Sequence, residues 1–304
     1  MKRLLLAVAA AMLLPMAAHA QSYGNSFYHA EYGGPNSLQH QIDRSGLNLE
    51  DFDVEGPDRF TEAGDADTVG GAATYWNVGG NDGERFEGRY QKAWRPFEGS
   101  RTRLVVDVPV DVMTFNPGFG IGQVQSVLGS VSVGAEIPVN PNWSLTPRFA
   151  YGLQGGSDFF GNGEMVSASV TSRYRIPDVG RGEIIIGNMV GYTETINTGI
   201  VSQPFFRFGG SSENWAFRDG IAYQFPLNYR MFGRQTSMRI SYVNTHLTGD
   251  PVAEDDLNEV ALSVGVRMRE TELRNKFEAL RLGVLYTFST DGYNAGTLTL
   301  GYRF

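Results

Sequence analysis

The 304-residue sequence contains no cysteine, which excludes disulfide bonds, thiol nucleophiles and thiolate ligands. After residue 20 it has no run of about 18 apolar residues, so a membrane-spanning helix is not expected there. Basic residues are also too few for a nucleic-acid-binding surface, because 25 Lys and Arg stand against 33 Asp and Glu. The chain has no phosphate-binding loop and no metalloprotease helix either. These absences leave few enzyme classes open.

The first twenty residues have the pattern of a cleaved export signal. Lys2 and Arg3 precede an apolar stretch at 4–14, and residues 18–20 (Ala-His-Ala) have the small residues of a cleavage site. A membrane anchor is the alternative, but the stretch is short and Pro15 interrupts it. Loss of the two basic residues changes the formal charge from −8 to −10. We therefore expect an exported protein.

Residues 21–68 form a separate acidic segment with poor strand periodicity. They include ten acidic residues and only two arginines, so they carry most of the net charge. Three alternatives are open for this segment: a periplasmic tail, a short helix, or a plug inside a barrel. The predicted organisation is a signal peptide at 1–20, the acidic segment at 21–68 and a β-barrel at 69–304.

From about residue 70 the chain repeats a strand-and-turn pattern. The clearest segment is 103–114, in which Leu104, Val106 and Val108 alternate with polar positions at the period of two that marks a strand with unlike faces. The 38 glycines and many aromatic residues also favour sheet. The predicted strands are 70–79, 84–95, 101–114, 123–137, 142–154, 163–176, 182–195, 214–226, 236–247, 257–269, 279–289 and 294–304.

This pattern predicts an all-β fold, a transmembrane antiparallel up-and-down barrel of about twelve strands, within a range of 10–14. A periplasmic β-sandwich is the alternative, but it has to bury many apolar strand faces. An even number of strands places both termini in the periplasm. The predicted periplasmic turns are 95–100, 138–142, 177–182, 227–234 and 270–278.

The last strand alternates Leu298, Leu300, Tyr302 and Phe304 with polar residues. This ending resembles the C-terminal strand of bacterial outer-membrane β-barrels, which the barrel assembly machinery recognises. The resemblance implies a location in the Gram-negative outer membrane, contact with its lipid and lipopolysaccharide, and an assembly signal at Tyr302 and Phe304. It implies nothing about oligomeric state.

The inward faces of the predicted strands are rich in arginine. A narrow lumen with unpaired charges is costly, so these residues need partners. Water and anions are one possibility, which makes a small anion-selective pore; the acidic segment acting as a plug is another, and pairing of lumen charges with one another is the third. The predicted lumen-lining residues are Arg103, Asp107, Asp111, Arg148, Arg173, Arg175, Arg239, Arg267 and Arg281.

One histidine has chemical interest. His246 shares an outward strand face with Asn244 and Thr248 near the extracellular end. The spacing resembles that of lipid-modifying barrels, which place a histidine base and a hydroxyl nucleophile two residues apart, although those enzymes have serine where this chain has Thr248. The alternative is a polar girdle residue above the bilayer. His29 and His40 have no ligand spacing around them.

No cofactor is expected, although carboxylates of the acidic loop 248–256 and of residues 50–53 offer weak sites for Ca²⁺ or Mg²⁺. His246-Leu247 and Gly249-Asp250 faintly resemble a His-Leu-Gly-Asp element of outer-membrane barrel families. The overall plan also resembles autotransporter translocator barrels that lack a passenger. We therefore expect a non-enzymatic barrel, either a narrow or plugged pore or a surface protein, with an outer-leaflet lipid hydrolase or deacylase using His246 as the alternative.

Overall fold

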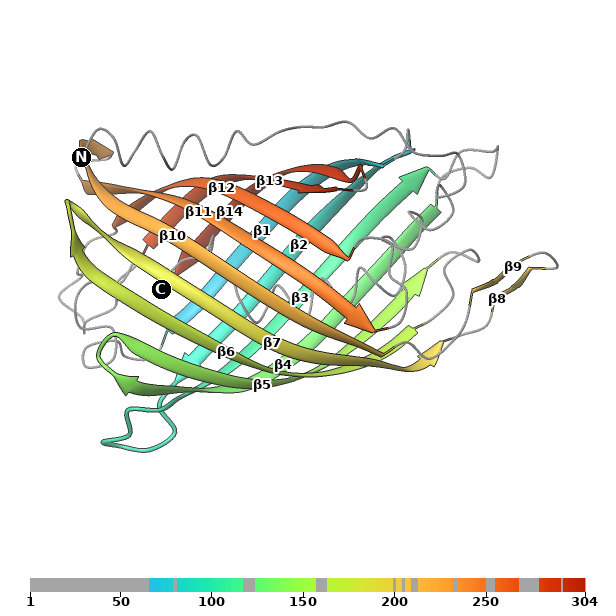
Figure 1. Ribbon diagram of the computed structural model, residues 1–304, viewed down its shortest axis with the longest axis horizontal. Coiled ribbons are helices and arrows are strands. Elements are labelled where there is room, and N and C mark those ends of the chain that lie inside the picture. The colour runs from blue at the N-terminus through green and yellow to red at the C-terminus, as the bar shows by residue number, and fades with distance from the viewer. Residues whose placement is uncertain are drawn as a thin grey trace.

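Twelve antiparallel strands of the chain close into one barrel (Figure 1). The computed structural model describes residues 66–78, 81–116, 124–156, 163–198, 201–203, 206–208, 213–231, 234–249, 255–267, 279–290 and 292–303. The predicted signal peptide, nearly all of the acidic segment, His29, His40 and Phe304 lie outside these residues. Among the described residues, no helix is long and apolar enough to cross a membrane.

The barrel strands follow one another in chain order around the wall. The sheet closes where β1 pairs with β14, for example Thr74 with Thr297. The strands are β1 (Ala66–Val78), β2 (Asn81–Trp94), β3 (Arg103–Asn116), β4 (Val124–Asn140), β5 (Trp143–Gly156), β6 (Gly163–Val179), β7 (Gly182–Thr198), β10 (Glu213–Met231), β11 (Arg234–Gly249), β12 (Asp256–Arg267), β13 (Ala279–Ser289) and β14 (Asn294–Arg303).

Burial alternates along each strand, as expected for a barrel with an apolar outside and a polar inside. In β3, Asp107 and Asp111 are fully buried, whereas Val108, Val110 and Val112 are exposed. The exposed apolar side chains of all twelve strands together form the outer surface. The predicted fold class is therefore confirmed, and the strand number is twelve.

Several strands extend beyond their predicted bounds, and two segments differ most from the prediction. The expected turn at 227–234 is too long, because β10 continues to Met231 and β11 begins at Arg234. Between the predicted strands at 182–195 and 214–226, the short strands β8 (Val201–Gln203) and β9 (Phe206–Phe208) form a hairpin beyond the end of the barrel (Figure 1). Neither segment has a long alternating pattern, which is why periodicity misplaced them.

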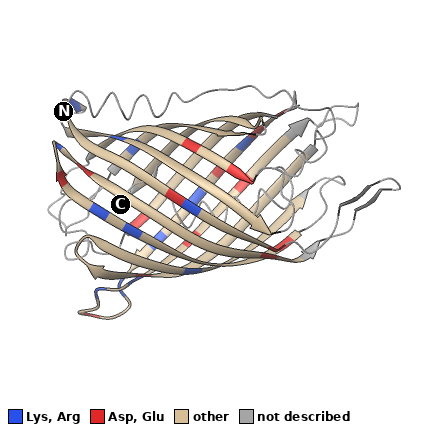
Figure 2. Ribbon diagram, viewed as in Figure 1, with Lys and Arg blue, Asp and Glu red and all other residues tan. Residues whose placement is uncertain are grey.

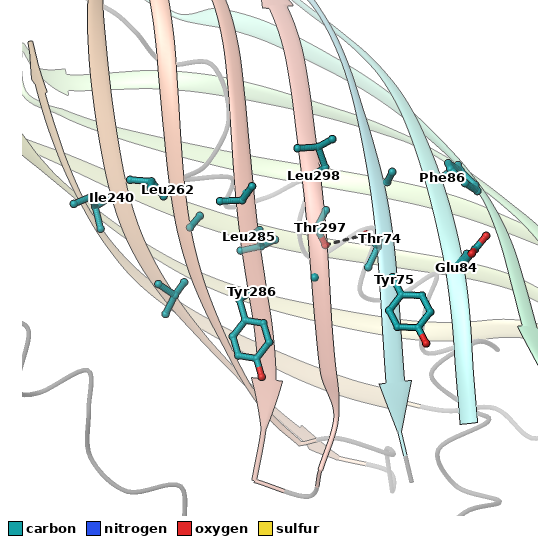
Figure 3. A pocket seen from close by; sticks show the side chains of 15 residues that line it. Thr74, Tyr75, Glu84, Phe86, Ile240, Leu262, Leu285, Tyr286, Thr297 and Leu298 are labelled. Carbon is teal, nitrogen blue, oxygen red and sulfur yellow. Dashed lines mark hydrogen bonds between the residues drawn. The ribbon is translucent and has the colours of Figure 1, made fainter. Parts of the chain in front are cut away.

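The outer surface of β1, β2 and β11–β14 holds an apolar hollow of about 850 Å³ (Figure 3). Its lining includes the exposed side chains of Tyr75, Phe86 and Leu298. Thr74 and Thr297 from the same strands are buried instead, and their hydroxyls hydrogen bond at 2.9 Å. The hollow contains no pair of catalytic side chains, so it belongs to the apolar outer surface.

Candidate functional site: the lumen and the outer rim

Ion pairs cross neighbouring strands on the inner wall. Arg89 donates through Nε and Nη2 to both carboxylate oxygens of Asp107, at 2.7 and 2.9 Å. Arg103 Nη2 lies 2.6 Å from Glu136 Oε2, and both side chains are buried. Such charge-assisted bonds are short and directional, so they fix the side chains that fill the lumen. The same wall holds Arg218–Glu259 at 2.6 Å and Arg175–Glu183 at 3.5 Å.

Other inward arginines bind neutral partners. Arg239 donates from Nε and Nη2 to Gln224 Oε1, at 2.9 and 2.7 Å. Arg281 donates to Ser263 Oγ at 2.9 Å and to Ser237 Oγ at 3.1 Å. Figure 2 shows basic and acidic residues distributed among the barrel strands. At the described inward positions arginines (85, 89, 103, 148, 173, 175, 218, 239 and 281) outnumber acids (87, 107, 111, 136, 183 and 259), so the wall has a positive excess.

The predicted lumen residues occupy the buried face of their strands. Asp107 and Asp111 are 0% exposed, and Arg103, Arg239 and Arg281 are at most 5% exposed. Three further predicted residues stand at inward positions of β5 and β6: Arg148, Arg173 and Arg175. Arg267 is the last residue of β12, and its side chain is outside the described part of the chain. Periodicity alone placed these positions.

An apolar cluster occupies one end of the inner wall, and we call it the apolar cap. Its large members stand near the ends of their strands next to the loops at 79–80, 117–123, 157–162 and 250–255. This is the extracellular end if both termini face the periplasm. The indole of Trp76 lies so close over Gly83 that any side chain at position 83 would collide with it. The cluster comprises Trp76, Met113, Leu128, Ala150, Met165, Leu257, Tyr293 and Ala295.

On the outside, near the same end, His246 pairs with the first residue of β12. His246 Nδ1 lies 2.8 Å from Asp256 Oδ1, and the two residues are register partners. The backbone N–H of Leu247 donates to the carbonyl of Asp255 at 2.7 Å, which holds the ends of β11 and β12 together. The side chains of His246 and Asp256 are 45% and 43% exposed. A carboxylate on Nδ1 favours the tautomer whose Nε2 is free to accept a proton.

The two other predicted catalytic residues lie on the same outward face but do not join that pair. Asn244 donates to Asn258 Oδ1 at 3.1 Å and to the Leu257 carbonyl at 3.4 Å. Thr248 is exposed, and within the described residues no hydrogen bond joins it to His246. The candidate base His246 and the Asp256 carboxylate that orients it are thus in hydrogen-bond contact. The Thr248 hydroxyl makes no such contact with His246.

The metal-binding interpretation has no support in the described part of the chain, where no group of three or more His, Asp or Glu lies close enough together to hold an ion. Residues 50–53 and 250–254 are outside that part. The assembly-signal residue Tyr302 stands in β14, and Phe304 follows the last described residue.

Several functional candidates were missed by the sequence analysis. Glu259 faces inward. The apolar–polar alternation of β12, extended by two residues towards the start of the strand, predicts this direction. The apolar cap was missed because large apolar residues such as Met113 and Met165 interrupt the expected polar face. The outward polar residues Asn188 and Asp219 were missed because each stands on the strand face that alternation assigns to apolar residues.

No protein-family model matches the sequence, and no curated protein matches it significantly. Solved structures do resemble the fold. The translocator domain of the autotransporter NalP from Neisseria meningitidis has a TM-score of 0.64 at 10% identity, covering 92% of this chain and 99% of that one. The beta domain of the Bordetella autotransporter Brka has a TM-score of 0.58 at 12% identity, covering 80% and 99%. The transport unit of AIDA-I from Escherichia coli gives 0.57 at 12%, covering 90% and 98%. The chain therefore has the fold of bacterial outer-membrane β-barrels.

Proposed function

We propose that the chain is an integral outer-membrane barrel whose lumen is a narrow, arginine-lined pore held closed by the apolar cap. The apolar cap carries this proposal: its large side chains occupy the extracellular end of the inner wall, beside Arg85 and Glu259, whereas most inward arginines stand along the middle and lower wall. Apolar constrictions close pores because water leaves them, and ions do not enter a dry segment. An excess of arginine below such a gate favours anions.

Export and assembly belong to the same proposal. The leader at 1–20 directs the chain out of the cytoplasm, the barrel assembly machinery recognises the last strand, and the exposed apolar side chains contact lipid and lipopolysaccharide. The solved autotransporter domains share the barrel but not enough sequence to transfer their transport role. No catalytic group is needed for this function.

The test is single-channel recording of the mature protein, residues 21–304, in a planar bilayer. We expect rare openings from the unaltered protein and steady, anion-selective steps from the triple variant Trp76→Ala, Met113→Ala and Met165→Ala, because the gate is widened. The matched control replaces Tyr75, Val112 and Val166, which neighbour the same three positions but face outward, by alanine. Silence from a folded triple variant that also lacks residues 21–65 contradicts a pore.

A second candidate is an outer-leaflet lipid hydrolase, and the pairing of His246 with Asp256 at 2.8 Å favours it. In this alternative His246 Nε2 takes the proton of the Thr248 hydroxyl, whose oxygen attacks an ester carbonyl of a lipid. The alcohol leaves with that proton, and water then releases the acyl group from Thr248. Asp256 keeps the imidazole oriented.

Release of fatty acid from vesicles or lipopolysaccharide tests the second candidate. His246→Ala and Thr248→Ala should each abolish it, whereas Thr248→Ser should retain it or raise it, because serine is the less hindered nucleophile. Asn244→Ala serves as the control on the same strand face. Equal release from Thr248→Ala and the unaltered protein means that Thr248 is not the nucleophile.

A further inference from the structure

A row of polar side chains crosses the outer surface of the barrel. Its members are cross-strand register partners on five consecutive strands, β6, β7, β10, β11 and β12, and all face outward. Asn188 Nδ2 donates a short hydrogen bond to Asp219 Oδ1, and Asn244 Nδ2 donates to Asn258 Oδ1 at 3.1 Å. We call this the polar row; it consists of Ser172, Asn188, Asp219, Asn244 and Asn258.

The centre of the polar row lies within the apolar outer surface. Asp219 is exposed and stands between Phe217 and Ile221, which are 42% and 47% exposed and face the same way. Within the described part of the chain, Asp219 makes no ion pair. A charged side chain against hydrocarbon is costly and usually marks a functional site with a partner.

The two ends of the row point towards opposite ends of the barrel. At one end Trp143 Nε1 donates to Ser172 Oγ at 2.9 Å, and Trp143 follows the turn at 141–142. At the other end Tyr242 Oη donates to Asn258 Oδ1 at 2.7 Å, and Asn258 stands close to the start of β12, beyond the loop at 250–255. The row is therefore a diagonal path from the periplasmic side towards the extracellular side.

Barrel geometry gives the height that this path covers. Neighbouring strands lie about 4.8 Å apart and tilt by roughly 40°, so five strands climb on the order of 12 Å. That is about half of the apolar band, which is roughly 25 Å tall. Trp143 below and the His246–Asp256 pair above extend the polar groups further in both directions. The polar row therefore interrupts the middle of the apolar band. This is the depth at which a polar headgroup meets the largest free-energy barrier to crossing the membrane.

The polar row could bind a second copy of this chain or a phospholipid headgroup, and the charge of the row favours the headgroup. A second copy of this chain, related by a two-fold axis through the row, brings the central residue of the row against itself. That residue is Asp219, so the contact places two like charges together. A phospholipid headgroup with an ammonium group instead supplies the positive charge and the N–H donors that the carboxylate accepts. The neighbouring amides offer donors to its phosphate.

We propose that the polar row is a path along which ammonium-bearing phospholipid headgroups cross between the two leaflets. Asp219 binds the ammonium group at the centre of the path, and Asn188, Asn244 and Asn258 hydrogen bond to the phosphate as it passes. The acyl chains stay in the surrounding lipid, against the apolar side chains of the same strands. This activity uses the outer surface alone and does not depend on the lumen.

The test uses the mature protein refolded into vesicles with an acyl-labelled fluorescent phosphatidylethanolamine, whose ammonium group is intact. Dithionite added outside bleaches only outer-leaflet probe, so the slow phase measures transfer between leaflets. We expect the double variant Asn188→Leu and Asp219→Leu to transfer this probe about tenfold more slowly, because a polar contact in the membrane is lost. Lipid-facing leucines suit the fold, so this variant is expected to assemble. Asp219→Glu should retain transfer.

Two controls make the result specific. Glu84→Leu removes another exposed, outward acid, which lies on β2 away from the row, and should leave transfer unchanged. A labelled phosphatidylglycerol, which lacks the ammonium group, should cross more slowly than phosphatidylethanolamine. Absence of transfer in the unaltered protein, or equal rates in the double variant, overturns the proposal. A dimer that the Asp219 substitution dissociates also overturns it, because the row is then an interface between copies.

Discussion

The free-energy cost of losing one partner of an ion pair differs widely between residues of this barrel, and burial determines the difference. Arg218 and Glu259 form an ion pair at 2.6 Å with both side chains 1% exposed. The pair of His246 and Asp256 is almost as short, yet both side chains are nearly half exposed. A buried pair has lost its hydration, so the loss of one partner leaves a charge that water cannot reach. An exposed pair exchanges its partner for water at little cost.

Glu259→Gln is accordingly expected to lower the free energy of unfolding by about 3–5 kcal/mol, because Arg218 stays buried without this carboxylate. Asp256→Asn, the matched change at the exposed pair, is expected to cost about 0–1 kcal/mol. Urea titration of the refolded protein in vesicles, followed by tryptophan fluorescence, measures both. The joint change Arg218→Met and Glu259→Leu should cost less than Glu259→Gln; a larger cost means that packing, not charge, determines the effect.

At the scale of the strands, alternation predicted most of the fold. In β3 the apolar residues at the even-numbered positions 104–112 face outward, and Arg103, Asp107 and Asp111 are buried on the inward face, because one strand face meets hydrocarbon and the other does not. Periodicity is a property of one strand, so it also located His246 on the outward face of β11. Turn lengths were less predictable: Leu227 and its neighbours belong to β10, which continues to Met231.

Features that depend on pairing between strands were not predictable in the same way. The polar row exists because the strand register brings Asn188, Asp219 and Asn244 side by side. The register between neighbouring strands cannot be predicted from the periodicity of either strand alone. The apolar cap depends likewise on barrel closure, which brings Leu257 of β12 and Trp76 of β1 to one end. The β8–β9 hairpin is too short for a period to be recognised.

At the scale of the whole molecule, charge is divided between two regions of opposite sign. The inner wall has more arginines than acids at its described positions, and residues 21–65 hold nine acids against two arginines. This segment leads directly into β1, whose first residue stands at the end of the barrel opposite the apolar cap. Opposite charges on one chain attract each other most strongly at low salt, because the screening length is about 10 Å at 0.1 M and 3 Å at 1 M.

Deletion of residues 21–65 tests whether the acidic segment occupies the pore. The deletion leaves β1 intact and is best made in the variant with alanine at 76, 113 and 165, whose gate is open. We expect conductance and anion preference to rise, because the deletion removes a negatively charged obstacle from an arginine-lined passage. Planar-bilayer recording at 0.1 M and 1 M salt measures both quantities.

The salt dependence separates a plug from a tail. If the acidic segment is held in the lumen by charge, the undeleted protein should gain more conductance between 0.1 M and 1 M than the bulk conductivity of the solution does, whereas the deleted protein should follow the bulk value. Replacement of the nine acids by their amides, with the length of the segment unchanged, should act like the deletion. Identical conductance and identical salt dependence with and without residues 21–65 place the segment outside the lumen, and the inner-wall arginines are then balanced by the acids of the wall and by mobile anions alone.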